Sequence, residues 1–225
     1  MQSRVLRWVF DKLMGLLTRR RVDGWENLPP KGPYIFAANH LHLLDAPLLY
    51  GLVGGDQLGG WAAEKWENDP FIGTILKLAG ATFIRRGAVD REAISTAVDW
   101  LKAGKIFGIA PEGTRSHTGG LIRGKSGIAY IAHEAGVPIV PIGHFGTEKI
   151  WSALAHLRRQ PVTVRIGKPF LLPPLDTHDR AASLRQQADE VMCRIAVLLP
   201  AEYRGIYASH PRLQELLREG RASST

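Results

Sequence analysis

The 225-residue sequence contains a single cysteine, Cys193. One thiol cannot close an internal disulfide bond, so a disulfide-stapled fold is excluded and a reducing compartment is favoured. Cys193 lies in the apolar pattern of a predicted helix, which indicates a buried structural thiol rather than a nucleophile. The chain also lacks the roughly 18 consecutive apolar residues that a membrane-spanning helix requires. Charged residues near its start, at Arg7, Asp11 and Lys12, argue against a signal peptide.

Signatures of nucleic-acid binding are missing as well. We find no zinc-finger spacing, no aromatic RNA-binding motif and no basic heptad segment, so no nucleic acid is expected as a partner. Positive charge is nevertheless in excess, with 29 Lys and Arg against 21 Asp and Glu and a formal net charge of +8. This excess favours an anionic partner, either a lipid surface or a phosphorylated substrate.

Residues 4–21 predict a separate amphipathic helix. Apolar side chains fall on one half of the helical wheel, charged side chains fall on the other, and three arginines close the segment. An apolar face with Trp8 near its edge and a basic end is typical of helices that lie in a membrane interface. The alternative is a helix packed on the protein's own core. We expect residues 1–22 to contact an anionic membrane surface, and the chain to be cytoplasmic and peripheral on the inner face of the cell membrane.

Residues 23–200 alternate between short apolar strands and helical patterns. This alternation predicts a single α/β domain whose mostly parallel or mixed central sheet is flanked by helices. Glycines at 80, 104 and 136 each end a helical pattern just before the next strand. Residues 201–225 are predicted to form a polar C-terminal tail. The predicted strands are 33–38, 58–63, 81–86, 105–110, 138–143 and 162–167, and the predicted helices are 46–53, 70–79, 90–103, 126–136, 147–157 and 180–199.

A first polar cluster, at residues 39–45, follows one of these strands and contains His40 and Asp45. Five residues apart, the two side chains would not share a helix face, but a turn between strand and helix would bring them together. An imidazole works best as a general base when a carboxylate fixes its tautomer. In an extended segment His40 and His42 would point to the same side, so a metal-dependent hydrolase, with His133 or His144 as an added ligand, is the rival chemistry.

A second polar cluster, at residues 111–116, follows another strand and reads Pro-Glu-Gly-Thr-Arg-Ser. Arg115 in this cluster and Arg86 at the end of a neighbouring strand are expected to converge on one edge of the sheet. Guanidinium groups bind phosphate in a bidentate manner, so this edge is a candidate anion site. Lys65 and Lys125 are further candidates for an oxyanion or anion contact, the second at the end of a basic, glycine-rich loop.

Four blocks of this sequence, in order, resemble the glycerolipid acyltransferase family, typified by 1-acylglycerol-3-phosphate acyltransferases. The resemblance covers roughly residues 30–170. It is carried by Asn39, His40 and Asp45, by Gly80, Phe83, Ile84 and Arg86, by Pro111 to Ser116, and by Val137 to Pro141. The family often has Ser at position 42 and Phe at position 110, where this chain has His and Ala.

The resemblance implies an O-acyltransferase that moves a fatty acyl group from acyl-CoA or acyl carrier protein to a lysophospholipid hydroxyl. The most fitting acceptor is 1-acylglycerol-3-phosphate, and neither a metal nor a bound cofactor is expected. By the same resemblance His40 is the general base and Asp45 its orienting partner. The phosphate pocket is assigned to Arg86, Glu112, Gly113, Thr114 and Arg115. Two alternatives are the metal-dependent hydrolase using His40, His42 and Asp45, and a peripheral lipid-binding protein without catalysis.

Overall fold

The computed structural model describes residues 2–54, 57–84 and 91–222. Its centre is the strand β2 (Tyr34–Ala38), in which all five side chains are buried. Such a strand is covered on both faces, as the alternation of strands and helices predicts. The other strands are β1 (Thr18–Asp23), β3 (Leu58–Ala63), β4 (Ala81–Ile84), β5 (Ile106–Ile109), β6 (Ile139–Phe145) and β7 (Gln160–Ile166).

The α-helices lie between these strands and at both ends of the described chain. They are α1 (Gln2–Leu17), α2 (Asp45–Val53), α3 (Ile72–Leu78), α4 (Arg91–Lys102), α5 (Gly127–Ala135), α6 (Ile150–Ala155), α7 (Arg180–Leu198) and α8 (Pro211–Ala222). Short 3₁₀ helices are η1 (Trp25–Asn27), η2 (Glu64–Trp66), η3 (Thr147–Lys149), η4 (Ala201–Tyr203) and η5 (Gly205–Tyr207). None of the helices in the described part of the chain is long and apolar enough to cross a bilayer.

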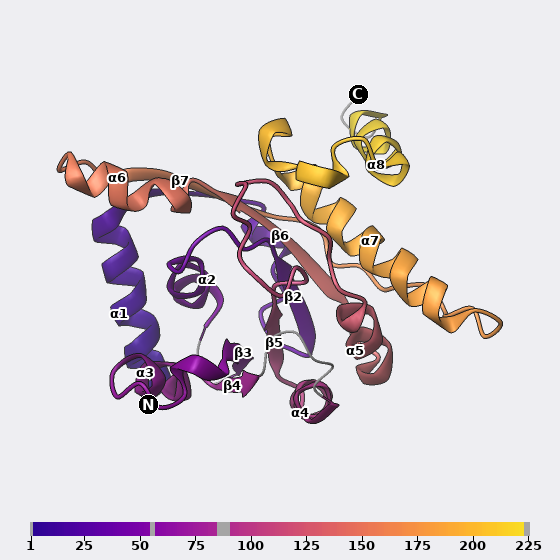
Figure 1. The fold of residues 1–225 in the computed structure, drawn as a ribbon, viewed down its shortest axis with the longest axis horizontal. Helices are drawn as coiled ribbons and strands as arrows, with labels where there is room; N and C mark the ends of the chain where they lie inside the picture. Colours follow the sequence, from indigo (N-terminus) through magenta and orange to yellow (C-terminus); the bar gives the residue numbers. More distant parts are fainter. Residues whose placement is uncertain (1, 55–56, 85–90, 223–225) are drawn as a thin grey trace.

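Within the described residues, the strands form one seven-stranded sheet in the order β1-β7-β6-β2-β5-β3-β4. All neighbouring pairs are parallel except β6 and β7, so the sheet is mixed (Figure 1). On β2, Ala37 pairs with Ile109 of β5, and Ala38 pairs with Ile142 of β6. The three segments that follow β2, β5 and β6 therefore leave the sheet at one edge, where ligands of open α/β sheets bind.

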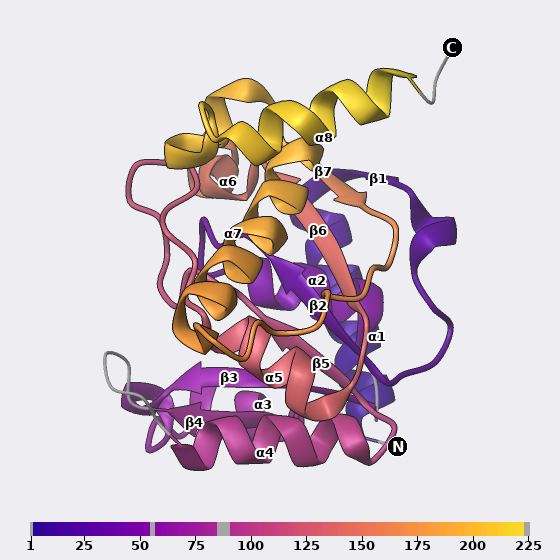
Figure 2. The ribbon, with the colours of Figure 1, turned by 90° about the vertical axis from the view of Figure 1, so that its right-hand side faces the viewer.

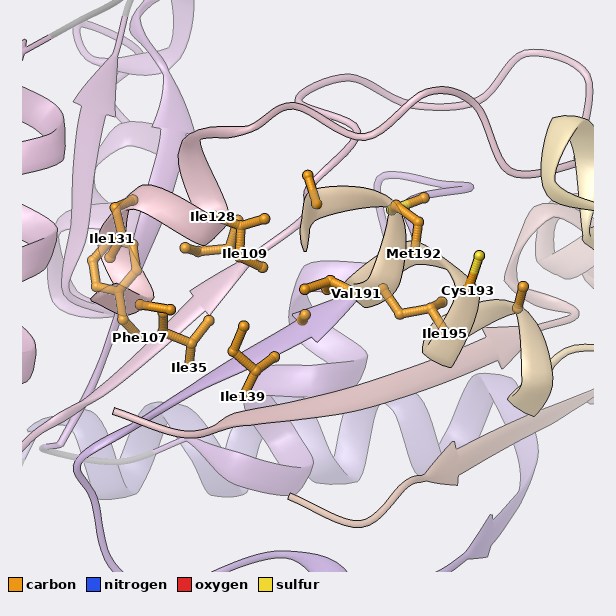
Figure 3. Close-up of a cluster of buried hydrophobic side chains, with 14 of the residues drawn as sticks. Ile35, Phe107, Ile109, Ile128, Ile131, Ile139, Val191, Met192, Cys193 and Ile195 are labelled. Carbon is orange, nitrogen blue, oxygen red and sulfur yellow. The ribbon is translucent and has the colours of Figure 1, made fainter. Parts of the chain in front are cut away.

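Helices cover both faces of the sheet and create two cores. Figure 1 shows α1 and α2 on one side of the sheet, and Figure 2 shows α4, α5, α7 and α8 in front of the other. On β2, Ile35 and Ala37 belong to the core under α5 and α7, while Tyr34, Phe36 and Ala38 belong to the core under α1 and α2. Figure 3 shows the first of these cores, in which side chains from β2, β5 and β6 meet those of α5 and α7. Cys193 is fully buried there, as predicted.

The first helix ends at Leu17, not at residue 21 as the sequence pattern predicts. The hydroxyl of Thr18 donates back to the carbonyl of Met14, and the six residues from Thr18 to Asp23 pair with β7 as strand β1. The three arginines are therefore part of a strand and not the basic end of a helix. Arg20 turns back to form an ion pair with Asp11 at 2.8 Å, which helps to satisfy its charge beside the helix.

The C-terminal segment is not merely a polar tail. It forms η4, η5 and α8, and it contributes three buried side chains, Tyr207, Leu213 and Leu216, to the core under α7. The Tyr207 hydroxyl donates to Asp189 at 2.8 Å and accepts from the backbone N–H of Gly124 at 3.2 Å. The sequence pattern missed this role because only a few apolar side chains, spaced among charged ones, reach the core.

Candidate active site

Two loops meet beside the end of the central strand. The histidine loop, residues 39–45, follows β2, and the glutamate loop, residues 111–116, follows β5. The backbone N–H of Ser116 donates to the carbonyl of His40 at 2.8 Å. The juxtaposition of the two polar clusters, expected from the order of apolar and polar segments, is confirmed.

His40 and Asp45 form a hydrogen-bonded pair, as the turn between strand and helix predicts. His40 Nδ1 lies 2.9 Å from Asp45 Oδ2, and a carboxylate only accepts, so Nδ1 carries the proton. The tautomer leaves a lone pair on Nε2. Because the His40 side chain is 19% exposed while that of Asp45 is 3% exposed, the imidazole reaches the surface and the carboxylate lies beneath it.

Asp45 is a carboxylate held by donors from two distant parts of the chain. Its Oδ2 also accepts from the backbone N–H groups of Leu41 at 2.6 Å and His42 at 2.7 Å, while Oδ1 accepts from the Thr147 hydroxyl at 2.6 Å. Asp45 is the first residue of α2, and its hydrogen bonds close the preceding loop. Burial opposes its ionisation, but the charge of His144 and the hydrogen bonds from His40, His42 and Thr147 lower its pKa to about 2.

Glu112 is a buried residue that holds the backbone of the histidine loop. It is 2% exposed, its Oε1 accepts from the N–H of His40 at 2.9 Å, and its Oε2 accepts from the N–H of Ile122 at 3.2 Å. Both oxygens of its carboxyl accept from backbone N–H groups, so the structure shows a framing contact for Glu112, and its place in a phosphate pocket stays a prediction. With Ser116, this residue holds the peptide groups on both sides of His40.

The pKa of Glu112 is raised to about 7. Burial is the main cause, and hydrogen bonds from the backbone of His40 and Ile122 offset it only in part. The charge of Asp45 raises the pKa of Glu112 further. No arginine, lysine or histidine side chain is among the causes of its shift, which separates Glu112 from Asp45.

Three of the four cationic residues predicted to contact an anion lie in described parts of the chain. Arg115 is half-buried, and its charge acts on His42, whose pKa is lowered mainly by burial. Lys125 packs its ammonium end against Gly113, at φ +68°, where an added Cβ would lie 3.0 Å from Nζ. Lys65 is exposed in η2, with its ammonium 4.8 Å from the centre of the Trp66 ring. Arg86, the fourth predicted cation, lies outside the described residues.

The backbone N–H of Gly113 in the glutamate loop is engaged within the chain. The N–H of Gly113 donates to the carbonyl of Ala110 at 3.0 Å, so this amide closes a turn. Thr114 is exposed and its neighbour Arg115 is partly covered, so both side chains lie at the surface of the loop. The candidate anion site therefore rests on Arg115, Thr114 and Lys125.

Thr147 is a site residue that no sequence pattern indicates, and Asn39 and His144 make contacts that were not predicted. The side-chain amide of Asn39 donates to the carbonyl of His144 and accepts from its N–H, both at 2.9 Å, which fastens the end of β2 to the end of β6. Asn39 belongs to a recognisable motif, but more than 100 residues separate it from His144 in sequence. Only the pairing of β2 with β6 reveals this contact.

Of the histidines of the rival metal site, His40 and His144 lie beside Asp45, whereas the rings of His42 and His133 contact other residues. His42 is in a turn, its Nδ1 accepts from the N–H of Leu44 at 3.3 Å, and its ring packs against Trp151. His133 bonds to Gln187 at 2.5 Å on α7. In the described ranges, three or more His, Cys, Asp or Glu side chains are nowhere grouped in an arrangement that would hold a metal ion.

A cavity of about 1120 Å³ adjoins the glutamate loop on the side of α4 and α5. Its apolar wall includes Ile94 and Val98 of α4 and Ile128 of α5, and Gly113 and Lys125 line it as well. The lining also includes charged residues, among them Arg91 and Arg123, so a cavity of this size accommodates a ligand with one long apolar part and one charged part.

Comparisons with known proteins agree with this arrangement. A profile of the family described as Acyltransferase matches residues 19–144, which is more than half of the chain. A 1-acyl-sn-glycerol-3-phosphate acyltransferase from Chlamydomonas reinhardtii is 32% identical over 191 residues, covering 82% of this chain and 54% of that protein. A lyso-ornithine lipid O-acyltransferase from Pseudomonas aeruginosa is 31% identical over 63% of this chain and 54% of its own length.

A solved structure is similar as well. The 1-acyl-sn-glycerophosphate acyltransferase PlsC from Thermotoga maritima superposes with a TM-score of 0.65 and 25% sequence identity, covering 84% of this chain and 75% of that one. The chain spans about half the length of the curated relatives it matches.

Proposed function

Because this chain belongs to the acyltransferase family, we propose that it transfers a fatty acyl group from an acyl thioester to the free hydroxyl of a lysophospholipid. The observation that carries this proposal is the His40–Asp45 pair beside Arg115, with the peptide of His40 held on both sides by the glutamate loop. The relatives named above differ in the acceptor's head group, but each name describes an acyl transfer to a lipid. Of the possible acceptors, 1-acylglycerol-3-phosphate fits the cationic side of the site best.

In this mechanism, His40 Nε2 takes the proton of the acceptor's hydroxyl as the oxygen attacks the thioester carbonyl carbon. The carbon–sulfur bond breaks when the tetrahedral intermediate collapses, and the leaving thiolate takes the proton from the imidazolium. Asp45 stabilises that imidazolium and keeps Nδ1 protonated throughout. The acceptor's hydroxyl occupies the place that serine has in a catalytic triad, so no covalent acyl-enzyme is formed.

Charge on the substrates is matched by the cations of the glutamate loop. We assign the acceptor's phosphate to Arg115, with Thr114 as a hydroxyl donor beside it, because guanidinium groups bind phosphate in a bidentate manner. Arg86 belongs to the same assignment by its place in the sequence motif. Lys125 is the better candidate for an anion or oxyanion contact, since its ammonium lies against Gly113, whereas Lys65 lies over Trp66.

The apolar cavity beside the glutamate loop is the proposed place for an acyl chain. Ile94 lies on its wall and is only half-buried, so a larger side chain there shortens the available space. We expect Ile94→Trp to lower the rate with long acyl donors more than with short ones. Equal rates across chain lengths would contradict this placement, and the short-chain rate in the same variant serves as the control for folding.

The outer face of α1 is the proposed contact with an anionic bilayer. One side of α1 packs on the core through Leu6, Phe10 and Met14. The alternative of a helix packed on the protein's own core therefore holds for this side of α1. The opposite side exposes a stripe of apolar side chains, which lies near the exposed cations Lys12 and Arg19. The stripe consists of Val5, Trp8, Val9, Leu13 and Leu16.

Point variants test this contact better than a deletion, because removal of residues 1–21 would also remove Met14 and most of β1. The double variant Trp8→Ser and Leu16→Ser is expected to sediment less with vesicles rich in phosphatidylglycerol. The matched control, Leu171→Ser with Ile206→Ser, removes exposed apolar side chains elsewhere on the surface. If the two double variants sediment alike, the proposed stripe is not the contact. Peripheral attachment on the cytoplasmic side of the membrane rests on this proposal.

The function itself is tested by thiol release from acyl-CoA in the presence of each of a panel of lysophospholipids, with acyl carrier protein as a second donor. We expect release only when an acceptor is present, and one doubly acylated lipid per thiol by mass spectrometry. Thiol release without acylated lipid, or loss of activity on chelation with stoichiometric zinc in the protein, would favour a hydrolase. Vesicle binding without any turnover would favour a lipid-binding protein.

A further inference from the structure

A second histidine lies beneath the proposed catalytic pair, on the far side of Asp45. His144 is fully buried at the end of β6, and its Nδ1 lies 3.8 Å from Asp45 Oδ1. No hydrogen-bond partner is recorded for this buried nitrogen among the described residues. The proposed function uses His40 and Asp45 but leaves His144 without a role.

The protons on His144 are restricted by its other contact. His144 Nε2 lies 2.7 Å from the backbone carbonyl oxygen of Asn39, which only accepts, so Nε2 must carry a proton. If the ring were neutral, Nδ1 would then be a lone pair, buried without a donor and directed at a carboxylate. If the ring carries a second proton, Nδ1–H faces Asp45 Oδ1 and the repulsion becomes an attraction.

The charge of Asp45 leads to the same conclusion. A carboxylate that is 2% exposed is stabilised by a nearby cation in addition to its hydrogen-bond donors, because the burial of an unpaired charge is strongly unfavourable. His40 is the only other ring bonded to Asp45 among the described residues, and it must be neutral in order to accept a proton from the substrate. The resident cation of Asp45 is therefore left to His144.

We propose that His144 is a positioning residue that carries a proton on both ring nitrogens, balances the charge of Asp45 and so keeps His40 neutral and ready to act as a base. The inference about its protons rests on the buried geometry alone. The inference about the readiness of His40 rests on the proposed function.

The other charged groups near His144 and Asp45 have hydrogen-bond or charge partners of their own. In the two loops, the charges of Asp45 and Arg115 act on His42. The two oxygens of Glu112 accept from the backbone N–H groups of His40 and Ile122. From η3, Glu148 accepts from the Gly146 N–H at 3.0 Å and from the Tyr203 hydroxyl at 2.6 Å. Neither glutamate approaches His144 within the 4.0 Å of an ion pair, so Asp45 is its carboxylate partner in the described chain.

Nitrogen NMR of the uniformly ¹⁵N-labelled protein tests the protonation directly. At pH 7 both ring nitrogens of His144, assigned by their absence in His144→Gln, are expected to resonate in the protonated range. A His144 nitrogen in the unprotonated range at pH 7 would overturn the proposal, whatever the protein catalyses. The measurement therefore fails or succeeds independently of the acyl-transfer assay.

The pH profile of kcat/KM tests the effect on His40. His144→Gln offers an amide N–H in place of Nε2, and His144→Phe preserves only the ring shape. In both variants His40 becomes the cation of Asp45, so the acidic limb of the profile moves about one unit to higher pH. If His144 had only a structural role, the maximal kcat/KM would fall in His144→Phe and recover in His144→Gln. Neither the acidic nor the basic limb of the pH profile would then move.

The matched control is His133→Gln, which removes a half-buried imidazole that bonds to Gln187 away from the site. Its profile is expected to coincide with that of the unaltered protein. Profiles of the two His144 variants that coincide with it as well would overturn the proposal, even if the NMR signals report a protonated ring.

Discussion

The histidine loop and the glutamate loop each bury one carboxyl group, and the two groups behave in opposite ways. Asp45 and Glu112 are both 2% exposed, but the pKa of Asp45 is lowered to about 2 whereas that of Glu112 is raised to about 7. Asp45 accepts hydrogen bonds from two side chains and two backbone amides and lies between two imidazoles. Within the described residues, Glu112 accepts from two backbone amides and from no side chain.

The difference teaches that burial alone does not fix the role of a carboxyl group. Partner donors make Asp45 an anion, which is suited to stabilising an imidazolium during a reaction. With no cationic side chain acting on it among the described residues, Glu112 remains near the balance between its two forms at neutral pH, and its contacts are to the backbone. We therefore interpret the histidine loop as the reacting part of the site and the glutamate loop as the frame that holds it.

The largest effect is expected when the charge of Asp45 is removed. Asp45→Asn preserves the shape of the side chain but removes the charge that orients and stabilises the His40 imidazolium. We expect kcat of acyl transfer to fall on the order of a thousandfold or more, with a much smaller change in KM. Steady-state kinetics with acyl-CoA would check this, and a loss of less than about tenfold would mean that the charge of Asp45 is not used.

The next effect concerns the free energy of unfolding, to which Glu112 and Asp45 contribute with opposite pH dependence. The folded protein keeps the proton of Glu112 up to about pH 7, whereas the ordinary value for an unfolded chain is 4.5. Unfolding therefore releases this proton, and the free energy of unfolding decreases by up to about 3 kcal/mol as the pH rises from about 4.5 to about 7. Asp45 has the opposite sign: its contribution is present above its ordinary value of 3.8 and is lost as the pH falls toward about 2.

Urea denaturation across this pH range is the measurement. Glu112→Gln should flatten the decrease between about pH 4.5 and about pH 7, and Glu134→Gln, which alters an exposed ion pair with Arg180, should leave it in place. An unchanged slope in Glu112→Gln would show that this carboxyl does not hold its proton in the folded state.

A smaller effect is expected on the rate when the frame is damaged. In Glu112→Gln, one oxygen still accepts from a backbone N–H, but the amide group turns a donor toward the other N–H. We expect a loss of roughly tenfold to a hundredfold in kcat, from displacement of His40 rather than from loss of a reacting group. A loss as large as that of Asp45→Asn would contradict the division between the reacting part and the frame.

The smallest of these effects sharpens the account of Asp45 itself. Thr147→Val removes the hydroxyl that donates to Oδ1 at 2.6 Å and retains a side chain of similar volume. A hydrogen bond to a charged group contributes about 1.5–3 kcal/mol, so a decrease in kcat of about tenfold is expected when the other donors remain. Rates equal to those of the unaltered protein would show that this donor is dispensable for orientation.

Much of this arrangement could be predicted because it is local in sequence. Apolar runs followed by polar clusters located β2 and β5, and Gly80, Gly104 and Gly136 adopt the positive φ angles expected of residues that end helices. The helix predicted over 180–199 is α7, and Asp179 caps it with its carboxylate accepting from the N–H of Ala182 at 3.0 Å. The His40–Asp45 contact needed only a turn of a few residues.

The rest depends on contacts that no local pattern contains. Thr147 lies 102 residues from Asp45 in sequence and meets it only because β6 pairs with β2. Strand β1 was missed because charged residues, Arg19 to Arg21, occupy an edge strand, where their side chains reach solvent or Asp11. The contacts of Glu112 with the backbone of His40 and Ile122 could not be predicted, because a motif fixes the identity of a residue but not the direction in which its side chain points.

The central claim is that His40, with its proton on Nδ1 held by Asp45, is the base that activates the acceptor's hydroxyl. Its most direct test is the rate of acylated lipid formation by purified His40→Ala under saturating acyl-CoA and lysophospholipid, with folding checked by thermal denaturation. A folded variant whose rate falls at least a hundredfold is the predicted result. A folded variant that acylates the lipid at close to the rate of the unaltered protein would contradict the account.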